Sequence, residues 1–251
     1  MRLLLCNDDG ISARGLATLR DALGALHDVV VVAPSTEQSA KSHALTMHEP
    51  LRAREVEPGV WAVSGTPADC VYLALHHLLD EPPDLVVSGI NRGSNLGNDV
   101  FYSGTVAAAM EACLQGFPSV AISLHIEPDD RDRHWATAGA VAQRIVNSVL
   151  ANGLPKRRLL NVNVPNIALD QLKGIRTATL GVRRYSARVD ERRDPRGRRY
   201  FWIGGDHMHF DDDPASDGPM VEDGFAAVTP LCPDWTDAGS MTALAPWIDA
   251  S

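Results

Sequence analysis

Cysteine is scarce in this sequence, and the spacing of the few cysteines excludes two common kinds of site. The 251 residues contain 4 cysteines, which are Cys6, Cys70, Cys113 and Cys232. No two of them are separated by two residues, so neither a zinc ribbon nor a thioredoxin-type redox pair is expected. The first three lie in apolar runs and are expected to be small buried side chains. Unpaired cysteines are typical of a reducing compartment, so we expect a cytoplasmic protein.

The sequence also lacks a long apolar run and an excess of positive charge. No segment approaches the roughly 18 apolar residues of a membrane span, so no association with a membrane is expected. The apolar run that ends at Cys6 is too short for the h-region of a signal peptide and predicts a strand instead. The formal net charge of −9 argues against a general nucleic-acid-binding protein, which needs a basic face. It does not exclude a small phosphorylated substrate, because one metal ion and a few backbone N–H groups can reverse the local field.

The two common nucleotide-binding fingerprints are missing as well. No Gly-Lys-Ser/Thr follows the glycine-rich segment 89–97, so this segment is not a P-loop. The first β-α turn, Asn7–Gly10, lacks the Gly-x-Gly-x-x-Gly pattern of dinucleotide-binding proteins. Any nucleotide would therefore be bound by other means.

Apolar patterning over residues 1–165 predicts alternating strands and helices. A continuous β-branched run such as Val29–Val32 is typical of a strand buried on both faces. Leucines that recur at three and four residues, as at Leu16, Leu19 and Leu23, predict a helix. The patterns predict strands at 2–6, 29–33, 84–88, 119–124 and 159–164, a hairpin within 44–64, and helices after Gly10, from Thr66, at 104–114 and at 134–150. This alternation favours an α/β fold with a Rossmann-like, doubly wound and mostly parallel sheet.

The pattern changes after Pro165. Residues 183–199 hold eight Arg against three acidic residues, which gives a local charge of +8 − 3 = +5. The following residues, to Pro230, alternate weakly and are rich in Gly, Pro and Asp, and a last short helix is possible near 241–248. We therefore expect residues 1–165 to be the catalytic core and residues 166–251 to be a β-rich extension with an Arg-rich arm.

Two adjacent carboxylates, Asp8 and Asp9, follow the first predicted strand. In open α/β sheets ligands bind beyond the carboxyl ends of the strands. Adjacent carboxylates repel each other, and a bound cation removes that conflict. Both side chains can converge only if the backbone turns, which Gly10 permits. The alternative is that Asp8 or Asp9 caps the helix that follows.

Two later segments could bind an anion at the same edge of the sheet. Asn91 and Asn95 lie in the glycine-rich segment 89–97, whose backbone N–H groups could approach a phosphate, although an ordinary turn is the alternative. Ser103, followed by Gly104 and Thr105, lies at a predicted helix N-terminus, which attracts phosphate. Simple N-capping by Ser103 is compatible with that role.

The candidate ligands are oxygen atoms, and this favours a hard cation. Mg²⁺ and Mn²⁺ prefer such ligands, whereas zinc prefers Cys and His. His207 and His209, with Asp211–Asp213, could suggest a second metal. Their Gly- and Asp-rich surroundings favour a solvated loop instead.

The sequence at these positions resembles the stationary-phase survival protein SurE family of 5′/3′-nucleotidases. The similarity extends over nearly the whole chain. The matching stretches are Asn7–Gly10, Val31–Pro34 with Ser39, Gly65–Val71, Val87–Gly93 with Asn95–Gly97, Tyr102–Glu111, Asn161–Pro165, Asp194–Gly197, Trp202–Gly204 and Val228–Leu231.

The resemblance implies a set of ligands and an assembly. It implies one divalent metal ion per subunit, most simply Mg²⁺ or Mn²⁺, held by Asp8, Asp9, Ser39 and Asn91. The phosphate would be bound by Asn95 together with Ser103, Gly104 and Thr105. It also implies a homodimer or homotetramer with contacts through the Arg-rich arm and the C-terminal extension. The alternative for the arm is a solvated basic hairpin beside the acidic body.

The expected activity is that of a 5′-nucleotidase, a phosphoric monoester hydrolase. Nucleoside 5′- and 3′-monophosphates would be hydrolysed to nucleoside and phosphate by metal-activated water. Asp8 and Asp9 would be the catalytic residues, with Asp9 favoured as proton acceptor. Two alternatives remain: a broader phosphatase or exopolyphosphatase, and a non-catalytic nucleotide-binding protein with the same fold.

Overall fold

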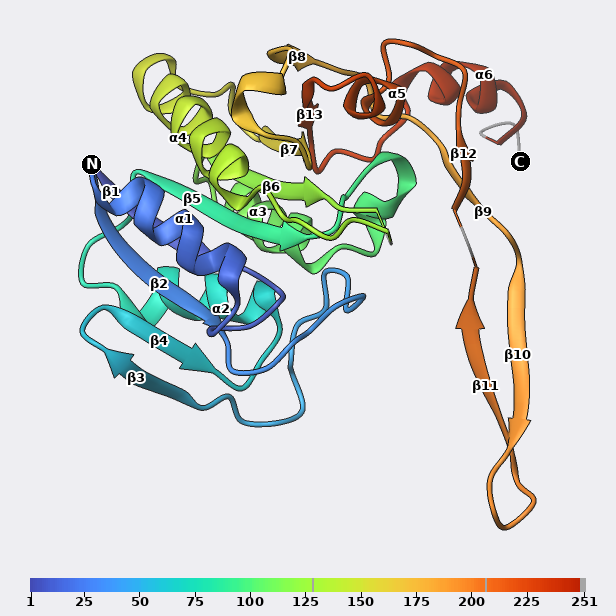
Figure 1. The fold of residues 1–251 in the computed structure, drawn as a ribbon, viewed down its shortest axis with the longest axis horizontal. Coiled ribbons are helices and arrows are strands. Elements are labelled where there is room, and N and C mark those ends of the chain that lie inside the picture. Colours follow the sequence, from blue (N-terminus) through green and yellow to red (C-terminus); the bar gives the residue numbers. More distant parts are fainter. Residues whose placement is uncertain (128, 206, 249–251) are drawn as a thin grey trace.

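A central mixed sheet forms the body of the protein (Figure 1). The structure is a computed structural model that describes residues 1–127, 129–205 and 207–248. Within these residues the sheet has nine strands in the order β3-β4-β2-β1-β5-β6-β7-β13-β8. Six neighbouring strands, from β4 to β7 in that order, are parallel to one another. The predicted α/β class and mostly parallel sheet are therefore confirmed.

Strands and helices alternate through the first 165 residues. The strands are β1 (Arg2–Cys6), β2 (Asp28–Pro34), β3 (Ala53–Glu57), β4 (Val60–Val63), β5 (Leu85–Arg92), β6 (Ser119–His125) and β7 (Leu159–Pro165). The helices are α1 (Arg14–Gly24), α2 (Pro67–Leu73), α3 (Gly104–Leu114) and α4 (Trp135–Asn152), with a π-helical turn at Ala74–Leu78 and a 3₁₀ turn at Gly97–Phe101. The predicted hairpin is present but shorter than expected, because it begins only at Ala53.

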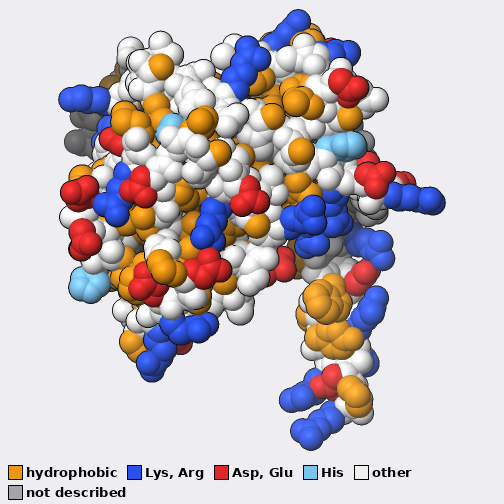
Figure 2. Space-filling model, turned by 60° about the vertical axis from the view of Figure 1, so that its left-hand side comes forward, with side chains coloured by type: hydrophobic (Ala, Val, Ile, Leu, Met, Phe, Trp, Pro, Cys, Tyr) orange, Lys and Arg blue, Asp and Glu red, His pale blue; other side chains and the backbone are white. Residues whose placement is uncertain are grey.

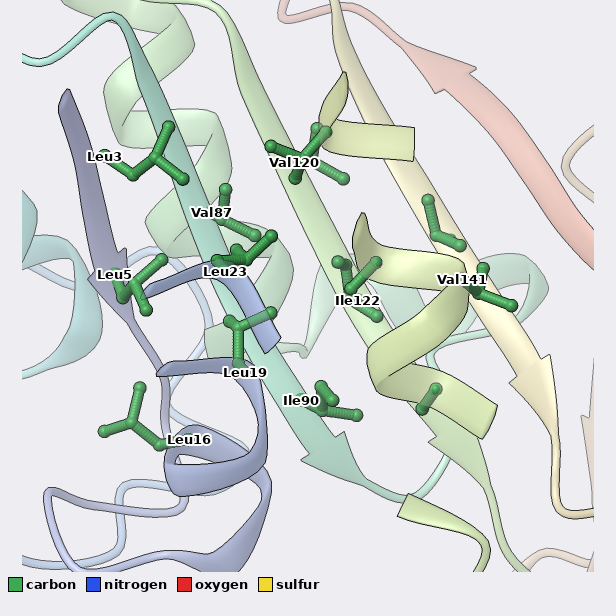
Figure 3. Close-up of a cluster of buried hydrophobic side chains, with 14 of the residues drawn as sticks. Leu3, Leu5, Leu16, Leu19, Leu23, Val87, Ile90, Val120, Ile122 and Val141 are labelled. Carbon is green, nitrogen blue, oxygen red and sulfur yellow. The ribbon is translucent and has the colours of Figure 1, made fainter. Parts of the chain in front are cut away.

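Helices cover both faces of the sheet, and β1 shows how its side chains divide between them. Leu3 and Leu5 point into a core formed with α1 and α4, and Figure 3 shows them near the leucines of α1. Leu4 and Cys6 point to the opposite face and pack with α2 and α3. All four side chains are fully buried, so truncating one of the leucines to Ala would cost about 2–5 kcal/mol.

Helix α2 begins where its sequence predicts. The Thr66 hydroxyl accepts a hydrogen bond from the Asp69 backbone N–H at 3.1 Å, and the Asp69 carboxylate accepts one from the Thr66 N–H at 2.8 Å. Pro67 occupies the first turn, where its fixed φ is compatible with a helix and no backbone donor is needed. With this reciprocal capping, only three residues separate the end of β4 from the start of α2.

Strand β5 is longer than the sequence predicted. The expected strand ended at Ser88 and a loop was to follow, but β5 continues to Arg92 through a register shift between Ser88 and Asn91. A bulge of this kind bends a strand and redirects its side chains. Asn91 therefore projects from the end of a strand, which fixes it more firmly than a loop would.

The chain after Pro165 leaves the sheet and returns to it. Its elements are a 3₁₀ turn (Leu169–Gln171), β8 (Ile175–Thr177), β9 (Arg183–Tyr185), β10 (Arg188–Arg193), β11 (Arg199–Gly204), β12 (His207–Phe210), α5 (Asp217–Glu222), β13 (Ala226–Leu231) and α6 (Ala238–Ile248). Strand β13 pairs antiparallel with β7 and parallel with β8. Part of the predicted C-terminal extension is thus an edge of the main sheet.

The solvated loop predicted around residues 207–210 is wrong. This segment forms β12, which pairs antiparallel with β9. The composition of the segment favoured a loop, but a partner strand more than twenty residues earlier supplies the hydrogen bonds. The prediction that His207 does not bind a metal concerns a side chain that lies outside the described residues.

The Arg-rich arm is a hairpin of β10 and β11 that extends away from the body in Figure 1. Side chains along β11 are exposed, and Figure 2 shows basic and hydrophobic side chains together on this projection. The exposed apolar residues of the arm are Val189, Tyr200, Phe201, Trp202 and Ile203.

No helix among the described residues has the length and apolar character needed to cross a bilayer.

Candidate active site

The loops after β1, β2 and β5 meet at one edge of the sheet. Because these strands are parallel, their carboxyl ends share that edge. The Gln38 N–H donates to the carbonyl oxygen of Asp8 at 2.8 Å, and the Arg92 N–H donates to the Asp9 carboxylate at 3.0 Å. Gly10 adopts a φ of 94°, which is the turn after the two carboxylates that the sequence predicted.

A pocket of about 220 Å³ lies at this edge. It brings together side chains that the sequence analysis selected from four separate segments. Its lining includes Asp8, Ser39, Asn91, Asn95 and Ser103.

Asp8 is the most deeply placed of these side chains, with 4% of its surface exposed. Its carboxylate accepts a hydrogen bond from the Thr105 hydroxyl. Helix α3 approaches so closely that a Cβ on Gly104 would lie 2.8 Å from the Cβ of Asp8. Burial raises the pKa of Asp8 to about 6, with the nearby charge of Asp9 adding to the rise and the Thr105 hydrogen bond opposing it. A carboxylate in such a place is stabilised by a cation.

The positions of Gly104 and Thr105 differ from the roles expected of them. Both were predicted to contact phosphate. The side chain of Thr105 is fully buried, its hydroxyl donates to Asp8, and it is not among the residues that line the pocket. Gly104 acts by lacking a side chain, which lets the N-terminus of α3 lie against Asp8. These two residues therefore position Asp8, and the Thr105 backbone N–H also contacts its carboxylate.

Asp9 is half-buried and lies beside the pocket, not in its lining. It lines a neighbouring pocket of about 320 Å³ with Arg92, and Arg92 also lines the pocket of Asp8. Burial raises the pKa of Asp9, and the Arg92 N–H opposes that rise. The alternative that Asp8 or Asp9 caps the first helix is wrong, because α1 begins at Arg14 and Ala13 occupies the cap position without a side-chain hydrogen bond.

Ser39 and Asn91 complete the set of oxygen atoms that could hold a metal ion. Asn91 Nδ2 donates to the carbonyl oxygen of Gly93 at 2.8 Å, which leaves the amide oxygen of Asn91 available to the pocket. The Ser39 hydroxyl donates to Glu37 at 2.9 Å, so its lone pairs remain available. One buried carboxylate with amide and hydroxyl oxygens suits a hard divalent cation, and the residues present therefore fit such an ion.

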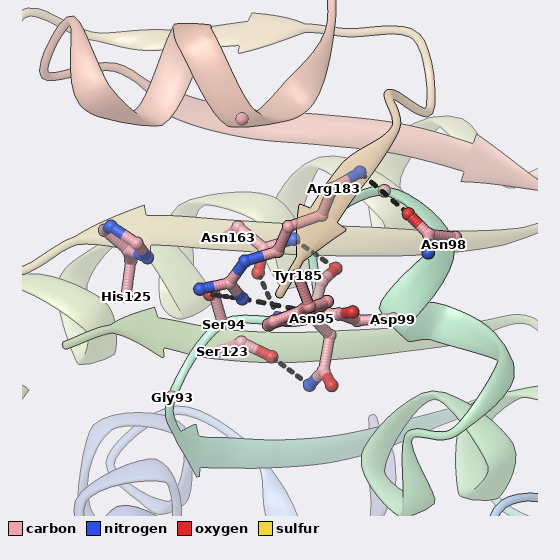
Figure 4. A network of polar contacts seen from close by, with 12 residues as sticks. Gly93, Ser94, Asn95, Asn98, Asp99, Ser123, His125, Asn163, Arg183 and Tyr185 are labelled. Carbon is pink, nitrogen blue, oxygen red and sulfur yellow. Dashed lines mark hydrogen bonds and ion pairs between the residues drawn. The ribbon is translucent and has the colours of Figure 1, made fainter. Parts of the chain in front are cut away.

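Hydrogen bonds hold Asn95 and Ser103 in place in the lining of the pocket. The Asn95 side chain donates to the Ser123 hydroxyl at 2.7 Å, and its backbone N–H donates to Asn163 at 2.8 Å (Figure 4). Ser103 accepts a hydrogen bond from the Val106 N–H at 3.0 Å. Ser103 therefore caps α3 as the alternative proposed, while also lining the pocket.

The sequence analysis missed a polar cluster that joins the arm to the pocket. Asp99 lines the pocket, pairs with the Arg183 guanidinium at 2.9 Å and accepts a hydrogen bond from the Tyr185 hydroxyl. Burial, with the Asp99 hydrogen bond, raises the pKa of the Tyr185 phenol. Arg183 also donates to Ser94 at 3.2 Å. The base of the arm, strand β9, is thus bonded directly to the site.

The fold and these oxygen-bearing side chains define a class: α/β proteins of Rossmann-like topology with a carboxylate site at the carboxyl edge of the sheet. The family model described as "Survival protein SurE" matches residues 3–187. The chain therefore belongs to the SurE family, which confirms the resemblance seen in the sequence.

Named relatives are similar over almost their whole length. The "5'-nucleotidase SurE" of Geobacter metallireducens is 48% identical over 247 residues, covering 98% of this chain and 97% of the relative. The protein of the same name from Syntrophotalea carbinolica is 49% identical, with coverage of 98% and 97%. Among solved structures, the SurE protein of Aquifex aeolicus is 40% identical, has a TM-score of 0.86, and covers 98% of this chain and 99% of that one.

Proposed function

We propose that the protein is a metal-dependent nucleotidase that hydrolyses nucleoside 5′- and 3′-monophosphates to nucleoside and phosphate. The observation that carries the proposal is the pocket in which Asp8, Ser39 and Asn91 lie beside Asn95 and the N-terminus of α3. The relatives named 5'-nucleotidase support the 5′ activity, because they align with 98% of this chain.

Asp8, Asp9, Ser39 and Asn91 would hold one divalent cation, Mg²⁺ or Mn²⁺. Such an ion supplies a Lewis acid that polarises a phosphoryl oxygen. Thr105 and Gly104 fix the position of Asp8, and the Arg92 N–H fixes one oxygen of Asp9. These contacts therefore orient both carboxylates.

The phosphate would bind between the ligand set and the N-terminus of α3. The N-terminus of that helix attracts an anion through its dipole. Asn95 lines the same pocket, and Ser123 fixes its amide. Phosphate contacts of this kind carry no information about the base, so they do not favour one nucleotide over another.

Water would attack phosphorus directly, and no phosphoenzyme would form. Asp9 is the favoured proton acceptor, because it lies beside the pocket with one carboxylate oxygen not used by Arg92. Ser103 is a poor nucleophile, since its oxygen accepts from Val106 N–H and no described base contacts it. Acid quenching within one turnover of radiolabelled AMP should leave no phosphate on the protein; labelled protein would overturn direct attack.

A panel of phosphate esters with Mn²⁺, Mg²⁺ or EDTA tests the function itself. Turnover of 5′- and 3′-monophosphates with metal, and none with EDTA, is expected. Faster turnover of polyphosphate or of non-nucleoside esters would favour the broader phosphatase. Nucleotide binding without any turnover would favour a non-catalytic protein.

We also propose a homodimer or homotetramer in the cytoplasm. The β10–β11 hairpin carries exposed apolar side chains away from the body, and a subunit contact would bury them. All four cysteines are unpaired and three are buried, which suits a reducing compartment.

A further inference from the structure

A second pocket adjoins the candidate active site. Its volume is about 390 Å³, and Ser103 lines both pockets. The two residues before Ser103 divide between them, since Phe101 lines the second pocket and Tyr102 the first. The Ser42 hydroxyl donates to the Phe101 carbonyl at 2.6 Å, which ties the loop after β2 to this dividing segment. The same two loops therefore build both pockets.

The walls of the second pocket are mostly apolar. They include Val100, Phe101, Met110, Leu231 and Trp235, with Ser42 and His43 as polar groups.

Two of its walls have defined geometry. The rings of Phe101 and Trp235 meet edge to face, with centroids 6.0 Å apart and an interplanar angle of 84°. His43 Nε2 lies 2.7 Å from the carboxylate of Glu111, which is buried in α3 and holds the imidazole in place. The pocket thus has two exposed aromatic side chains and one anchored imidazole.

We propose that this pocket binds the nucleoside part of the substrate, with the base against Phe101 or Trp235 and the phosphate at the neighbouring metal site. The proposal rests on the nucleotidase function proposed above. A nucleoside is the occupant that the geometry favours, because the leaving group of a bound phosphate ester must extend from the phosphate site and Ser103 lines both that site and this pocket. The volume lies in the range of small-molecule sites, which are typically apolar with a few polar groups.

The chemistry of the walls also predicts the selectivity. Aromatic rings stack on any base, because every base has a π face. Few hydrogen-bonding groups line the pocket, so the edge of the base is hardly read. All common bases should be accepted, and purines should bind more tightly because they bury more area.

Trp235→Ala tests the pocket against the phosphate site. With AMP, KM should rise about tenfold, the loss expected when a stacking partner is removed, while kcat changes little. With glycerol phosphate, which has no base, both constants should stay as in the unaltered protein. Trp247→Ala is the matched control, since Trp247 is also exposed in the C-terminal segment but does not line the pocket.

A binding measurement gives a readout that does not depend on turnover. Adenosine should quench the tryptophan fluorescence of the intact protein and of Trp247→Ala, and should lose that effect in Trp235→Ala. An unaltered protein that hydrolyses neither ester would sink the proposed function. If it hydrolyses both and Trp235→Ala leaves the AMP constants and the adenosine quenching unchanged, only the pocket proposal is wrong. A change in assembly mass with unchanged KM would make the pocket a subunit contact and would equally overturn it.

Discussion

At the scale of single residues, the position of Asp8 depends on two residues of α3. Thr105 donates its hydroxyl to the Asp8 carboxylate, and Gly104 has no side chain that would collide with Asp8. Neither residue would be chosen from the sequence as a partner of Asp8, because more than ninety residues separate them along the chain. The role of Gly104 and Thr105 in positioning Asp8 becomes visible only in the folded structure.

Replacing Thr105 by Val should separate positioning from binding. The substitution keeps the shape but leaves a buried carboxylate oxygen without its donor, which costs about 1–3 kcal/mol of stability. Small displacements of a catalytic group are costly, so kcat should fall about 10- to 100-fold with little change in KM. Thr137→Val is the matched control: Thr137 is also buried in a helix, and its hydroxyl donates to the Ile167 carbonyl at 2.8 Å. It should lose stability without losing kcat; an equal loss of kcat in both variants would contradict the role of Thr105.

Replacing Asp8 by Asn should remove metal binding without unfolding the protein. A neutral amide is a weaker ligand for a hard cation. Mn²⁺ affinity by calorimetry should fall more than about 100-fold, because losing a direct ligand should cost more than losing a side chain that only orients a ligand. In EDTA the variant should melt at a higher temperature than the unaltered protein. The unaltered protein then buries a carboxylate without a cation, which is unfavourable, and the variant carries a neutral amide there. Asp170→Asn, at an exposed position, should change neither value. Unaltered Mn²⁺ affinity in the Asp8 variant would exclude Asp8 as a ligand.

At the scale of elements, the predictability of each strand depends on where its hydrogen bonds go. Strands β1 and β2 are central, so both faces are buried and the sequence shows continuous apolar runs. Within the part of the chain that the structure describes, strand β12 pairs only with β9, and its Gly- and Asp-rich surroundings suggested a loop. The end of β5 was missed because its bulge is a response to β6, which local composition does not record. Secondary structure set by a distant partner is the part that a single sequence hides.

The same reasoning applies to the candidate site. The rule that ligands bind at the carboxyl edge of a parallel sheet led from the sequence to Asp8, Asn91 and Ser103. It could not lead to the pair of Asp99 and Arg183, which are 84 residues apart and belong to elements outside the strand–helix alternation.

Strand β6 carries a histidine that should make stability depend on pH. His125 is buried and pairs with Glu127 at 2.9 Å, and its Nδ1 has no hydrogen-bond partner among the described residues. Burial lowers the pKa of His125 below its ordinary 6.5, Glu127 and Asp130 oppose that change, and Arg183 adds to it. The unfolded chain therefore binds the proton more readily, so this contribution to stability is present above the ordinary pKa and is lost as pH falls through the lower folded value.

The measurement is the free energy of unfolding in urea at pH 7.5 and pH 5.5. Lowering the pH should destabilise the unaltered protein relative to His125→Gln, because only the unaltered protein loses the His125 contribution, whereas the raised pKa of Asp8 acts in the opposite direction in both proteins. His48→Gln, at an exposed position, should keep the full difference. An unchanged pH dependence in His125→Gln would show that other groups cause it.

At the scale of the whole molecule, the arm is the surface through which we expect copies of the chain to associate. Ile203 is 91% exposed on β11, an unusual position for such a side chain unless a partner covers it. Ile203→Asp should convert the proposed oligomer into a smaller species in light scattering at micromolar concentration. Leu26→Asp, on an exposed leucine of the body, should leave the mass unchanged. A monomeric unaltered protein would refute the oligomer, and the arm would then be the solvated hairpin of the alternative.

Strand β13 has a consequence for the order in which the protein can be made. It lies between β7 and β8 although about sixty residues, including the whole arm, separate it from β7 in the chain. During synthesis β7 is therefore an open edge, able to pair with a neighbouring chain, until residues 226–231 leave the ribosome. Closing that edge requires a contact across a long loop, which slows folding. The nascent protein thus passes through a stage in which the loops at the carboxyl ends of the strands are already in place while β7 still lacks the strand that pairs with it. A chaperone would be most useful at that stage.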